Sequence, residues 1–387
     1  MSDNAILAIS ARAAELRGMG HDVISLAAGE PDLPTPAHIT EAAARAAADP
    51  AYHHYGTAVG LPQLRELAAH HLAATTHLAW SADDIQIALG TKHALYLALA
   101  AVLEPGDDVL VTAPGWPGHH GAIQAAGGHP RQVPVSADNN FLATPETLDA
   151  ARTPRTRALI LASPANPTGA VYPAHLLTDI ADWALQHDVW CITDDIYDQF
   201  VYDGVPTPLL AAAPQARDHC IAVNGVSKAH AMTGWRIGWL AGPPPVVTYA
   251  SRLVAQTVTH APLITQAAAV EALRGAGRPL REARTRYRAN RDRLAQALNS
   301  VPGIHCPLPD GGLYVFPTVT GLIDANRHRW TAAGDLAAWL LDEALLAVVP
   351  GDVFDAPERL RLCFAISETA LDLAIERLLH ALGPGTQ

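Results

Sequence analysis

The feature that most constrains the fold is an alternation of short β-rich runs with helical stretches between about residues 80 and 240. The β-rich runs lie near residues 85, 108, 158, 189, 220 and 237, with the sequences IQIAL, DVLVT, ALILA, VWCIT, CIAVN and IGWLA. Turn sequences such as Glu-Pro-Gly-Asp at 104–107 separate them. Strands that alternate with helices predict βαβ units around a mostly parallel sheet.

The length of the chain predicts two domains. It has 387 residues, and single cores stop growing near roughly 250–300 residues. Helical sequence continues from Pro243 to about Leu298, and two more strands are predicted near Leu313–Phe316 and Leu360–Phe364. We expect an N-terminal segment (1–44) that packs with the small domain, a large domain (45–285) and a small α+β domain (286–387).

Composition and charge exclude several classes of protein. The net charge of -12 without a basic run argues against nucleic-acid and anionic-membrane partners. No apolar run approaches the ~20 residues that span a bilayer, and Asp3 and Glu15 interrupt the region where a signal peptide would be apolar. The four cysteines lack CxxC spacing, so neither disulfides nor a zinc site are indicated. We expect a cytoplasmic protein with a small-molecule partner and no metal.

Lysine occurs at only two positions, Lys92 and Lys228, although the chain has 26 basic residues. Codon bias explains the replacement of most surface lysines by arginine. Arginine is always protonated at neutral pH, whereas a desolvated lysine can lose its proton and attack a carbonyl. If the protein uses Schiff-base chemistry, these two residues are the candidates.

The segment around Lys228 carries a family resemblance. It reads VNGVSKAHAMTGWRIG over 223–238 and places Lys228 in a turn eight residues before Arg236. It resembles the SK-x-x-x-M-x-G-W-R-I-G stretch of class I/II, fold-type I aminotransferases, which depend on pyridoxal 5'-phosphate (PLP). Six further segments match in order: SLAAGEPD (25–32), YGTAVG (55–60), GTK (90–92), NPTG (166–169), DDIY (194–197) and RLRLCF (359–364). Each motif is weak alone, but together they cover nearly the whole chain.

The resemblance implies an α/β fold of PLP type I: a large domain with a mostly parallel seven-stranded sheet flanked by helices, plus a smaller α+β domain. It makes Lys228 the catalytic, imine-forming residue. It sets Asp194 against the pyridine nitrogen, since the frame of D-x-I-Y favours Asp194 over Asp195. Asn166 and Tyr197 would donate to the phenolic oxygen of the cofactor, and Asn166–Pro167 would be a cis peptide. Alone, Asn166 or Tyr197 is equally an ordinary buried polar residue.

Further cofactor contacts follow from the same motifs. Trp116 would stack on the cofactor, with a core tryptophan as the alternative, and His119 would hold the aspartate ionised, with His120 as the competing candidate. Gly90 and Thr91 open a helix after a strand, where free N–H groups can hold a phosphate. Ser227 and Arg236 would complete this phosphate site. Tyr55 resembles the tyrosine that reaches the phosphate from the other subunit, which implies a homodimer.

For the substrate, the resemblance implies that Arg361 grips the α-carboxylate with the backbone of Gly29, and that Arg359 lies on the surface. Lys92 is ambiguous. One bacterial aspartate aminotransferase subgroup uses a lysine here for an acidic side chain, but a lysine beside a phosphate can also serve as charge balance.

The resulting hypothesis is ping-pong transamination between a small, possibly acidic L-amino acid and a 2-keto acid, with Lys228 as the proton carrier. The same residues also support β- or γ-elimination or replacement, oxidation or cyclisation in specialised metabolism. A non-enzymatic PLP-binding effector domain is the third hypothesis. It would need an attached DNA-binding domain, and none fits before Ser25.

Overall fold

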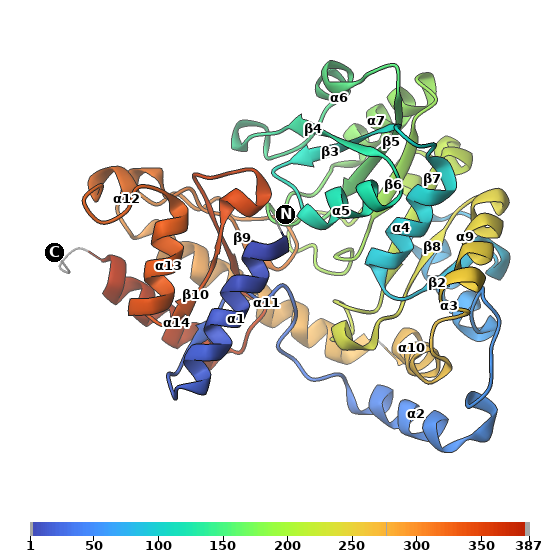
Figure 1. Ribbon diagram of the computed structural model, residues 1–387, viewed down its shortest axis with the longest axis horizontal. Helices are drawn as coiled ribbons and strands as arrows, with labels where there is room; N and C mark the ends of the chain where they lie inside the picture. Colours follow the sequence, from blue (N-terminus) through green and yellow to red (C-terminus); the bar gives the residue numbers. More distant parts are fainter. Residues whose placement is uncertain (1–2, 276, 384–387) are drawn as a thin grey trace.

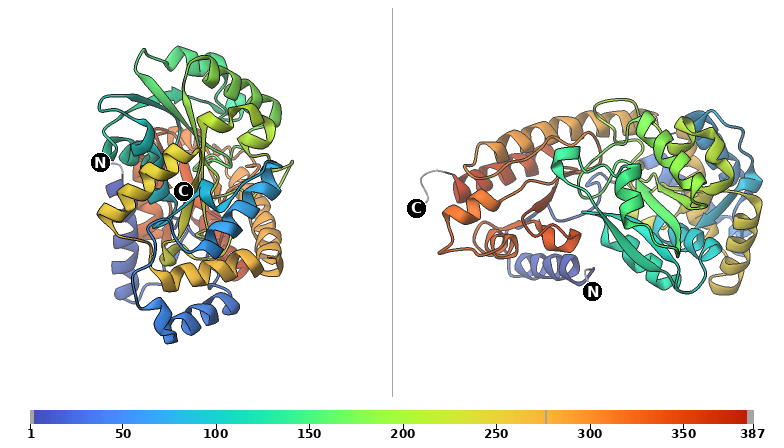
Figure 2. Two further views of the ribbon diagram at one scale, coloured as in Figure 1. Left: turned by 90° about the vertical axis from the view of Figure 1, so that its right-hand side faces the viewer. Right: turned by 90° about the horizontal axis from the view of Figure 1, so that it is seen from above.

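The computed structural model describes residues 3–275 and 277–383, which form two lobes joined by a long helix (Figures 1 and 2). The helices are α1 (Asp3–Gly18), α2 (Ala37–Ala48), α3 (Pro62–Thr76), α4 (Thr91–Val102), α5 (Pro117–Ala125), α6 (Pro145–Ala151), α7 (Ala174–Gln186), α8 (Leu209–Ala212), α9 (Pro244–Thr257), α10 (Leu263–Gly275), α11 (Gly277–Asn299), α12 (Thr320–Ala325), α13 (Ala333–Glu343) and α14 (Glu368–Leu382). The strands are β1 (Ile24–Ser25), β2 (Ile85–Ala88), β3 (Asp108–Ala113), β4 (His129–Pro134), β5 (Thr156–Ala162), β6 (Trp190–Asp194), β7 (Cys220–Gly225), β8 (Gly238–Ala241), β9 (Tyr314–Val315), β10 (Leu346–Ala347), β11 (Val349–Pro350) and β12 (Leu360–Cys363).

The large lobe is built on a seven-stranded sheet with the order β2-β8-β7-β6-β5-β3-β4. Strand β8 runs antiparallel to both of its neighbours, and the pairings from β7 through β4 are parallel. The predicted seven-stranded, mostly parallel sheet is therefore confirmed. The sequence pattern located six of these strands and missed β4, which lies at the edge.

Helices cover both faces of the sheet because the central strands are apolar on both sides. In β5, Ala158 and Ile160 pack with α4, α5 and α9, whereas Leu159 and Leu161 point to the opposite face and pack with α6, α7 and α8. A further core joins α2, α3 and α10 to the β2 end of the sheet. Two layers of helices thus leave the ends of the strands as the accessible part of the sheet.

The smaller lobe contains the antiparallel sheet β11-β12-β9 and the helices α12, α13 and α14, with the C-terminal half of α11 packed against α14. The N-terminal helix α1 lies beside this lobe (Figure 1), and β1 pairs in parallel with β10. The segment after β1 continues along β12, since Cys363 N donates to Leu26 O and Asp32 N donates to Ala365 O. Residues from the start of the chain are thereby built into the small lobe.

Two of the predicted domain limits fall within regular structure. From Ala37 onward, the predicted N-terminal segment packs on α10 of the large lobe instead of the small lobe, because α2 buries Ile39, Ala42 and Ala46. The predicted limit at 285/286 lies inside α11, which continues unbroken from Gly277 to Asn299. Among the described helices, none is long and apolar enough to cross a membrane. All four cysteines are buried and free.

Candidate active site

The sheet topology brings the predicted site residues to one edge. Strands β2, β3, β5, β6 and β7 run in the same direction, so their carboxyl ends meet there, and the antiparallel β8 begins at that edge. In open α/β sheets, ligands bind in the crevice outside these ends. A cavity of about 290 Å³ opens at this position, between the sheet and the small lobe.

Twelve of the residues predicted from the sequence line this cavity: Gly29, Thr91, Lys92, Trp116, His119, Asn166, Asp194, Tyr197, Ser227, Lys228, Arg236 and Arg361. Gly90 lies directly behind the wall, where a Cβ atom would approach Arg236 Nη2 to 2.5 Å. Tyr55 lies elsewhere: its side chain is 88% exposed, and its ring meets His260 edge-on at 6.1 Å. Five other lining residues were not predicted from the sequence: Ala162, Pro164, Ile196, Thr233 and Tyr314.

Lys228 follows β7 and reaches into the cavity. Its Nζ donates a 2.5 Å hydrogen bond to the carbonyl oxygen of Gly29. Burial lowers the pKa of the Lys228 amine to about 8, and the positive charges of Arg361 and Arg236 act in the same direction. A larger share of this amine is therefore neutral, and nucleophilic, near physiological pH than for an exposed lysine.

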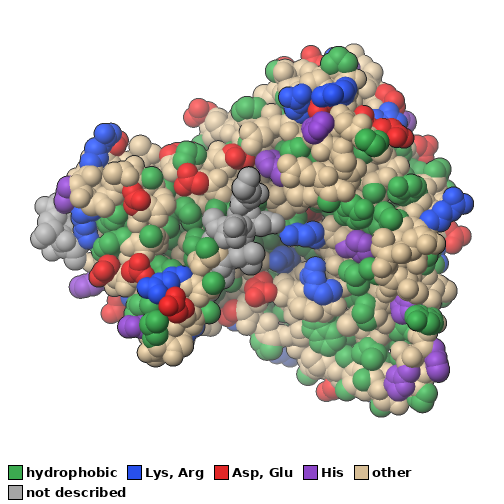
Figure 3. All heavy atoms as spheres, viewed as in Figure 1, with side chains coloured by type: hydrophobic (Ala, Val, Ile, Leu, Met, Phe, Trp, Pro, Cys, Tyr) green, Lys and Arg blue, Asp and Glu red, His purple; other side chains and the backbone are tan. Residues whose placement is uncertain are grey.

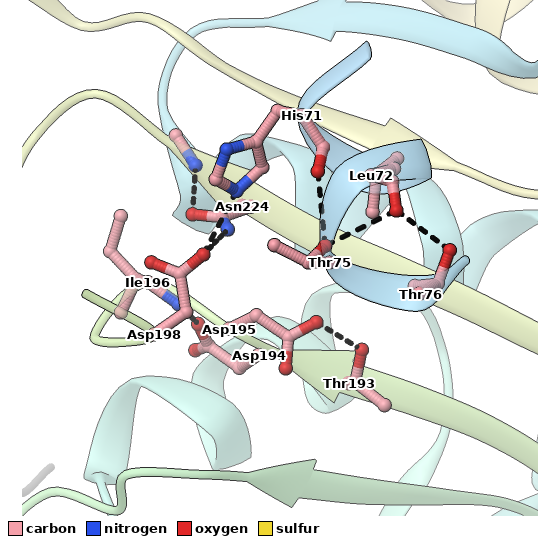
Figure 4. Close-up of polar contacts among 11 residues, drawn as sticks. His71, Leu72, Thr75, Thr76, Thr193, Asp194, Asp195, Ile196, Asp198 and Asn224 are labelled. Atoms are coloured by element: carbon pink, nitrogen blue, oxygen red, sulfur yellow. Dashed lines mark hydrogen bonds and ion pairs between the residues drawn. The ribbon is translucent and has the colours of Figure 1, made fainter. Parts of the chain in front are cut away.

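Asp194 is the last residue of β6 and Asp195 follows it directly; their side chains lie on different sides of the sheet, because successive residues of extended chain point to opposite faces. Asp194 lines the cavity and lies 3.1 Å from His119 Nε2 through its Oδ2. Figure 4 shows the Asp195 carboxylate turned toward Thr193, whose hydroxyl donates to it at 2.7 Å. Burial, with the charges of Asp198 and Asp194, raises the pKa of Asp195 to about 7. His120 is not among the lining residues.

Four groups form a cradle at the start of α4. Gly90 has a φ of 82°, which a side chain rarely tolerates, and it caps the helix that begins at Thr91. The Thr91 hydroxyl is buried and has no hydrogen-bond partner among the described residues. Arg236 is fixed beside it by a 2.7 Å bond from Nη1 to Thr233 O, and Ser227 lines the same wall. Free helix N–H groups, a guanidinium and hydroxyls are the donors that phosphate accepts.

Arg361 approaches the cavity from β12 of the small lobe. Its Nη2 donates to Ala27 O at 2.8 Å, its Nη1 donates to Asn166 Oδ1 at 3.3 Å, and its guanidinium lies 4.4 Å from the ring centroid of Tyr314. The peptide bond before Pro167 is cis. Two lobes therefore meet at this arginine.

Arg359 was expected on the surface, and this prediction was wrong. The residue is only 8% exposed, and its side chain donates to Phe316 O at 2.9 Å and lies over the rings of Phe141 and Phe316. Residues two apart in a strand share a face, so Arg359 is buried next to Arg361 but outside the cavity.

The cavity carries an excess of positive charge. Lys92, Arg236 and Arg361 line it, and within residues 3–275 and 277–383 none of them forms an ion pair. Lys92 Nζ instead lies 5.1 Å above the ring of Trp116, which contacts His119 edge-on. In the space-filling view, Lys or Arg side chains gather in the hollow between the lobes (Figure 3). Such a cavity is suited to ligands with more than one anionic group.

Comparison with known proteins decides the family. The model of the family "Aminotransferase class I and II" matches residues 21–378. The chain belongs to this family. An aspartate aminotransferase from Streptomyces avermitilis is 38% identical over 99% of this chain and 94% of its own length. An asparagine–oxo-acid transaminase from Streptococcus mutans is 35% identical over 98% of this chain and 96% of its own length.

Solved structures of the family share the fold throughout. An aspartate aminotransferase from Thermus thermophilus, solved with maleate, superposes with a TM-score of 0.90 at 37% identity, covering 98% of this chain and 96% of that chain. The chain is therefore an aminotransferase of fold type I, and the transamination predicted from the sequence is supported over the alternative reactions.

Proposed function

We propose that this aminotransferase uses PLP bound to Lys228 to move an amino group between an L-amino acid with an acidic side chain and a 2-keto acid. The observation that carries the proposal is the convergence of Lys228, Asp194 and two arginines on one cavity. These residues come from three separate segments of the chain, and the fold brings them to the wall of one cavity.

The residues present fit PLP. The unpartnered hydroxyl of Thr91, the helix start at Gly90 and the guanidinium of Arg236 match a phosphate. Asp194, held by His119, matches a protonated pyridine nitrogen. The depressed pKa of Lys228 matches an amine that attacks the aldehyde. When bound, PLP withdraws electrons from the Cα atom of an amino acid joined to it.

The remaining residues orient the substrate and move its proton. Arg361 offers a planar two-pronged contact for the α-carboxylate, and Gly29 lies beside it. Lys228 would serve as the base that accepts the proton from the substrate Cα atom and as the acid that returns it, because its amine lines the cavity and is partly neutral. The face of the Trp116 indole offers a stacking surface for the ring of a bound cofactor, which would restrict the motion of that ring.

The acidic side chain is proposed from Lys92, a lysine that lines the cavity without an ion pair among the described residues. A dicarboxylate would offer it a second carboxylate, after the first has paired with Arg361. The ligand of the Thermus thermophilus structure, maleate, and the names of the aspartate aminotransferases support the same substrate class.

We further propose a homodimer in which Tyr55 contacts the phosphate bound by the partner. Its exposed position outside its own cavity supports this arrangement. The cytoplasmic location expected from the sequence stays a prediction.

The test of the reaction is a half-turnover experiment. Holoenzyme mixed with aspartate and no keto acid should lose its visible absorbance, yield one equivalent of oxaloacetate and retain the nitrogen as the amine form of the cofactor. Lys228→Ala should abolish this conversion, whereas Arg359→Lys, a change of a neighbouring buried cation outside the cavity, should keep it. Release of ammonia in place of oxaloacetate would contradict transamination, and full conversion by Lys228→Ala would contradict the role of Lys228.

A further inference from the structure

Tyr314 lines the cavity together with Tyr197 and Arg361. It lies in β9, is 1% exposed, and its hydroxyl oxygen is 2.9 Å from that of Tyr197. The two rings meet edge to face with centroids 6.0 Å apart. The face of the Tyr314 ring supports the guanidinium of Arg361 at 4.4 Å. One buried side chain therefore contacts both the residue proposed for the cofactor oxygen and the residue proposed for the substrate carboxylate.

The packing fixes the position of the Tyr314 hydroxyl. In the β9–β12 ladder Tyr314 is opposite Cys363, so Arg361 is its diagonal neighbour on the same face. From the other side, a Cβ atom at position 29 would lie 3.0 Å from the hydroxyl, and glycine leaves this space free. The hydroxyl is thus held between Gly29 and Tyr197, at the back wall of the cavity.

The direction of the hydrogen bond between the two hydroxyls decides whether the Tyr197 hydrogen points into the cavity. Among the described residues, each hydroxyl has the other as its hydrogen-bond partner. Burial raises the pKa of Tyr314 to about 12 and that of Tyr197 well above its ordinary value, so both keep their hydrogens at neutral pH. If Tyr197 donated to Tyr314, its hydrogen would point away from a ligand. If Tyr314 donates, Tyr197 keeps its hydrogen for the cavity and becomes a stronger donor.

We propose that Tyr314 is a positioning residue, which donates to Tyr197 and so directs the Tyr197 hydrogen at the phenolic oxygen of bound PLP. The inference rests on the proposed function. Donation to that oxygen stabilises its negative charge and thereby lowers the pKa of the Schiff base on Lys228. Tyr314 then tunes the same pKa through Tyr197, without touching the cofactor oxygen.

The experiment is a spectrophotometric pH titration of the holoenzyme, which follows the visible absorbance of the Schiff base. Tyr314→Phe should raise the pKa of the Schiff base by roughly half a unit, and Tyr197→Phe should raise it by about one to two units. Phenylalanine keeps an aromatic face under Arg361, so the KM for the amino donor should stay within about twofold while kcat falls. As a matched control, Tyr202→Phe removes a buried hydroxyl that bonds Gly312 O at 2.8 Å in the same core, outside the cavity. It should leave the Schiff-base pKa unchanged.

The double variant Tyr197→Phe/Tyr314→Phe shows whether Tyr314 changes the Schiff-base pKa through Tyr197 or independently of it. If Tyr314 acts through Tyr197, Tyr314→Phe should cause no further shift in the Tyr197→Phe background. An equal shift in both backgrounds, no shift in either, or a comparable shift in Tyr202→Phe would overturn the inference. If the wild-type absorbance did not titrate, or Tyr197→Phe did not move it, the proposed function and this inference would both fail. A normal response of Tyr197→Phe with none from Tyr314→Phe would reject the inference alone.

Discussion

At the scale of single residues, the two lysines of the chain share one cavity but have different surroundings. Lys228 is buried, bonded to the Gly29 carbonyl and held partly neutral by its environment. Lys92 lies over the Trp116 ring and forms no ion pair within the described part of the chain. The first arrangement suits covalent chemistry, and the second suits an ionic contact with a ligand.

Replacing Lys92 tests this difference. Lys92→Ala should lower kcat/KM for aspartate and glutamate by about 10- to 100-fold, because a charge-assisted hydrogen bond is lost. The value for a neutral donor such as alanine should change little. Lys92→Arg keeps the charge and should recover part of the loss. Steady-state kinetics with the three donors measure these ratios, and equal losses for acidic and neutral donors would indicate that Lys92 serves the cofactor instead.

The sequence alone was enough to predict those site residues that lie in a recognisable local motif. Lys228, Asp194 and Arg236 lie in short segments with a fixed spacing, and the cavity contains all three. Tyr314 lies in a two-residue strand, and its importance comes from Tyr197 and Arg361, which are distant in the sequence. Burial of Arg359 likewise depends on aromatic rings from other segments, so no local pattern indicated it.

At the scale of elements, a polar network on the far side of the sheet joins α3, β7 and the turn after β6. Asp198 Oδ2 accepts from His71 Nε2 at 2.9 Å and from Asn224 Nδ2 at 3.0 Å (Figure 4). Burial alone would lower the pKa of His71, but the hydrogen bond to Asp198, with the charges of Asp198 and Asp195, raises it overall. These hydrogen bonds link the turn after β6, which follows Asp194, to β7, which precedes Lys228, on the side of the sheet away from the cavity.

Two groups on this side of the sheet, Asp195 and His71, make the free energy of unfolding depend on pH. The pKa of Asp195 rises from 3.8 to about 7 on folding, so the folded state binds more protons between these values and loses stability as pH rises through them. The raised pKa of His71 acts in the same direction. Asp195→Asn should therefore flatten the decline between pH 5 and 8 and raise the thermal midpoint at pH 8 by about 1–3 °C.

The measurement is the thermal midpoint by circular dichroism at both pH values. Asp138→Asn, a change of an exposed carboxylate in a surface turn, is the matched control and should leave the pH dependence as it is in the wild type. A variant at position 195 that declines as steeply as the wild type would show that other groups cause the pH dependence.

At the scale of the whole molecule, the sequence pattern was enough to predict six strands of the sheet, but not the edge strand β4 or the limits of the lobes. The six strands predicted from the sequence are mostly buried apolar runs, including β2 at the opposite edge of the sheet, whereas β4 has the sequence HPRQVP and is mostly exposed. An edge strand tolerates proline and polar residues, so its pattern resembles a loop. The two-residue strands β1, β10 and β11 exist only through pairing across the chain. The predicted limits at 44/45 and 285/286 lie inside the helices α2 and α11, which continue unbroken across them.

The proposed dimer leads to a prediction that only an assembly can satisfy. Tyr55→Ala should weaken PLP binding on the order of tenfold or more, since a hydrogen bond to a charged phosphate is lost. In a hybrid dimer with one Tyr55→Ala chain and one Lys228→Ala chain, one site contains Lys228 and receives an intact Tyr55 from the partner. That site should bind PLP and turn over like the wild type, at half the rate per dimer. Differently tagged chains, co-expressed and purified as hybrids, allow the comparison with each parent dimer. If Tyr55 acted within its own chain, the hybrid would have no intact site, and its weak PLP binding would match that of the Tyr55→Ala parent.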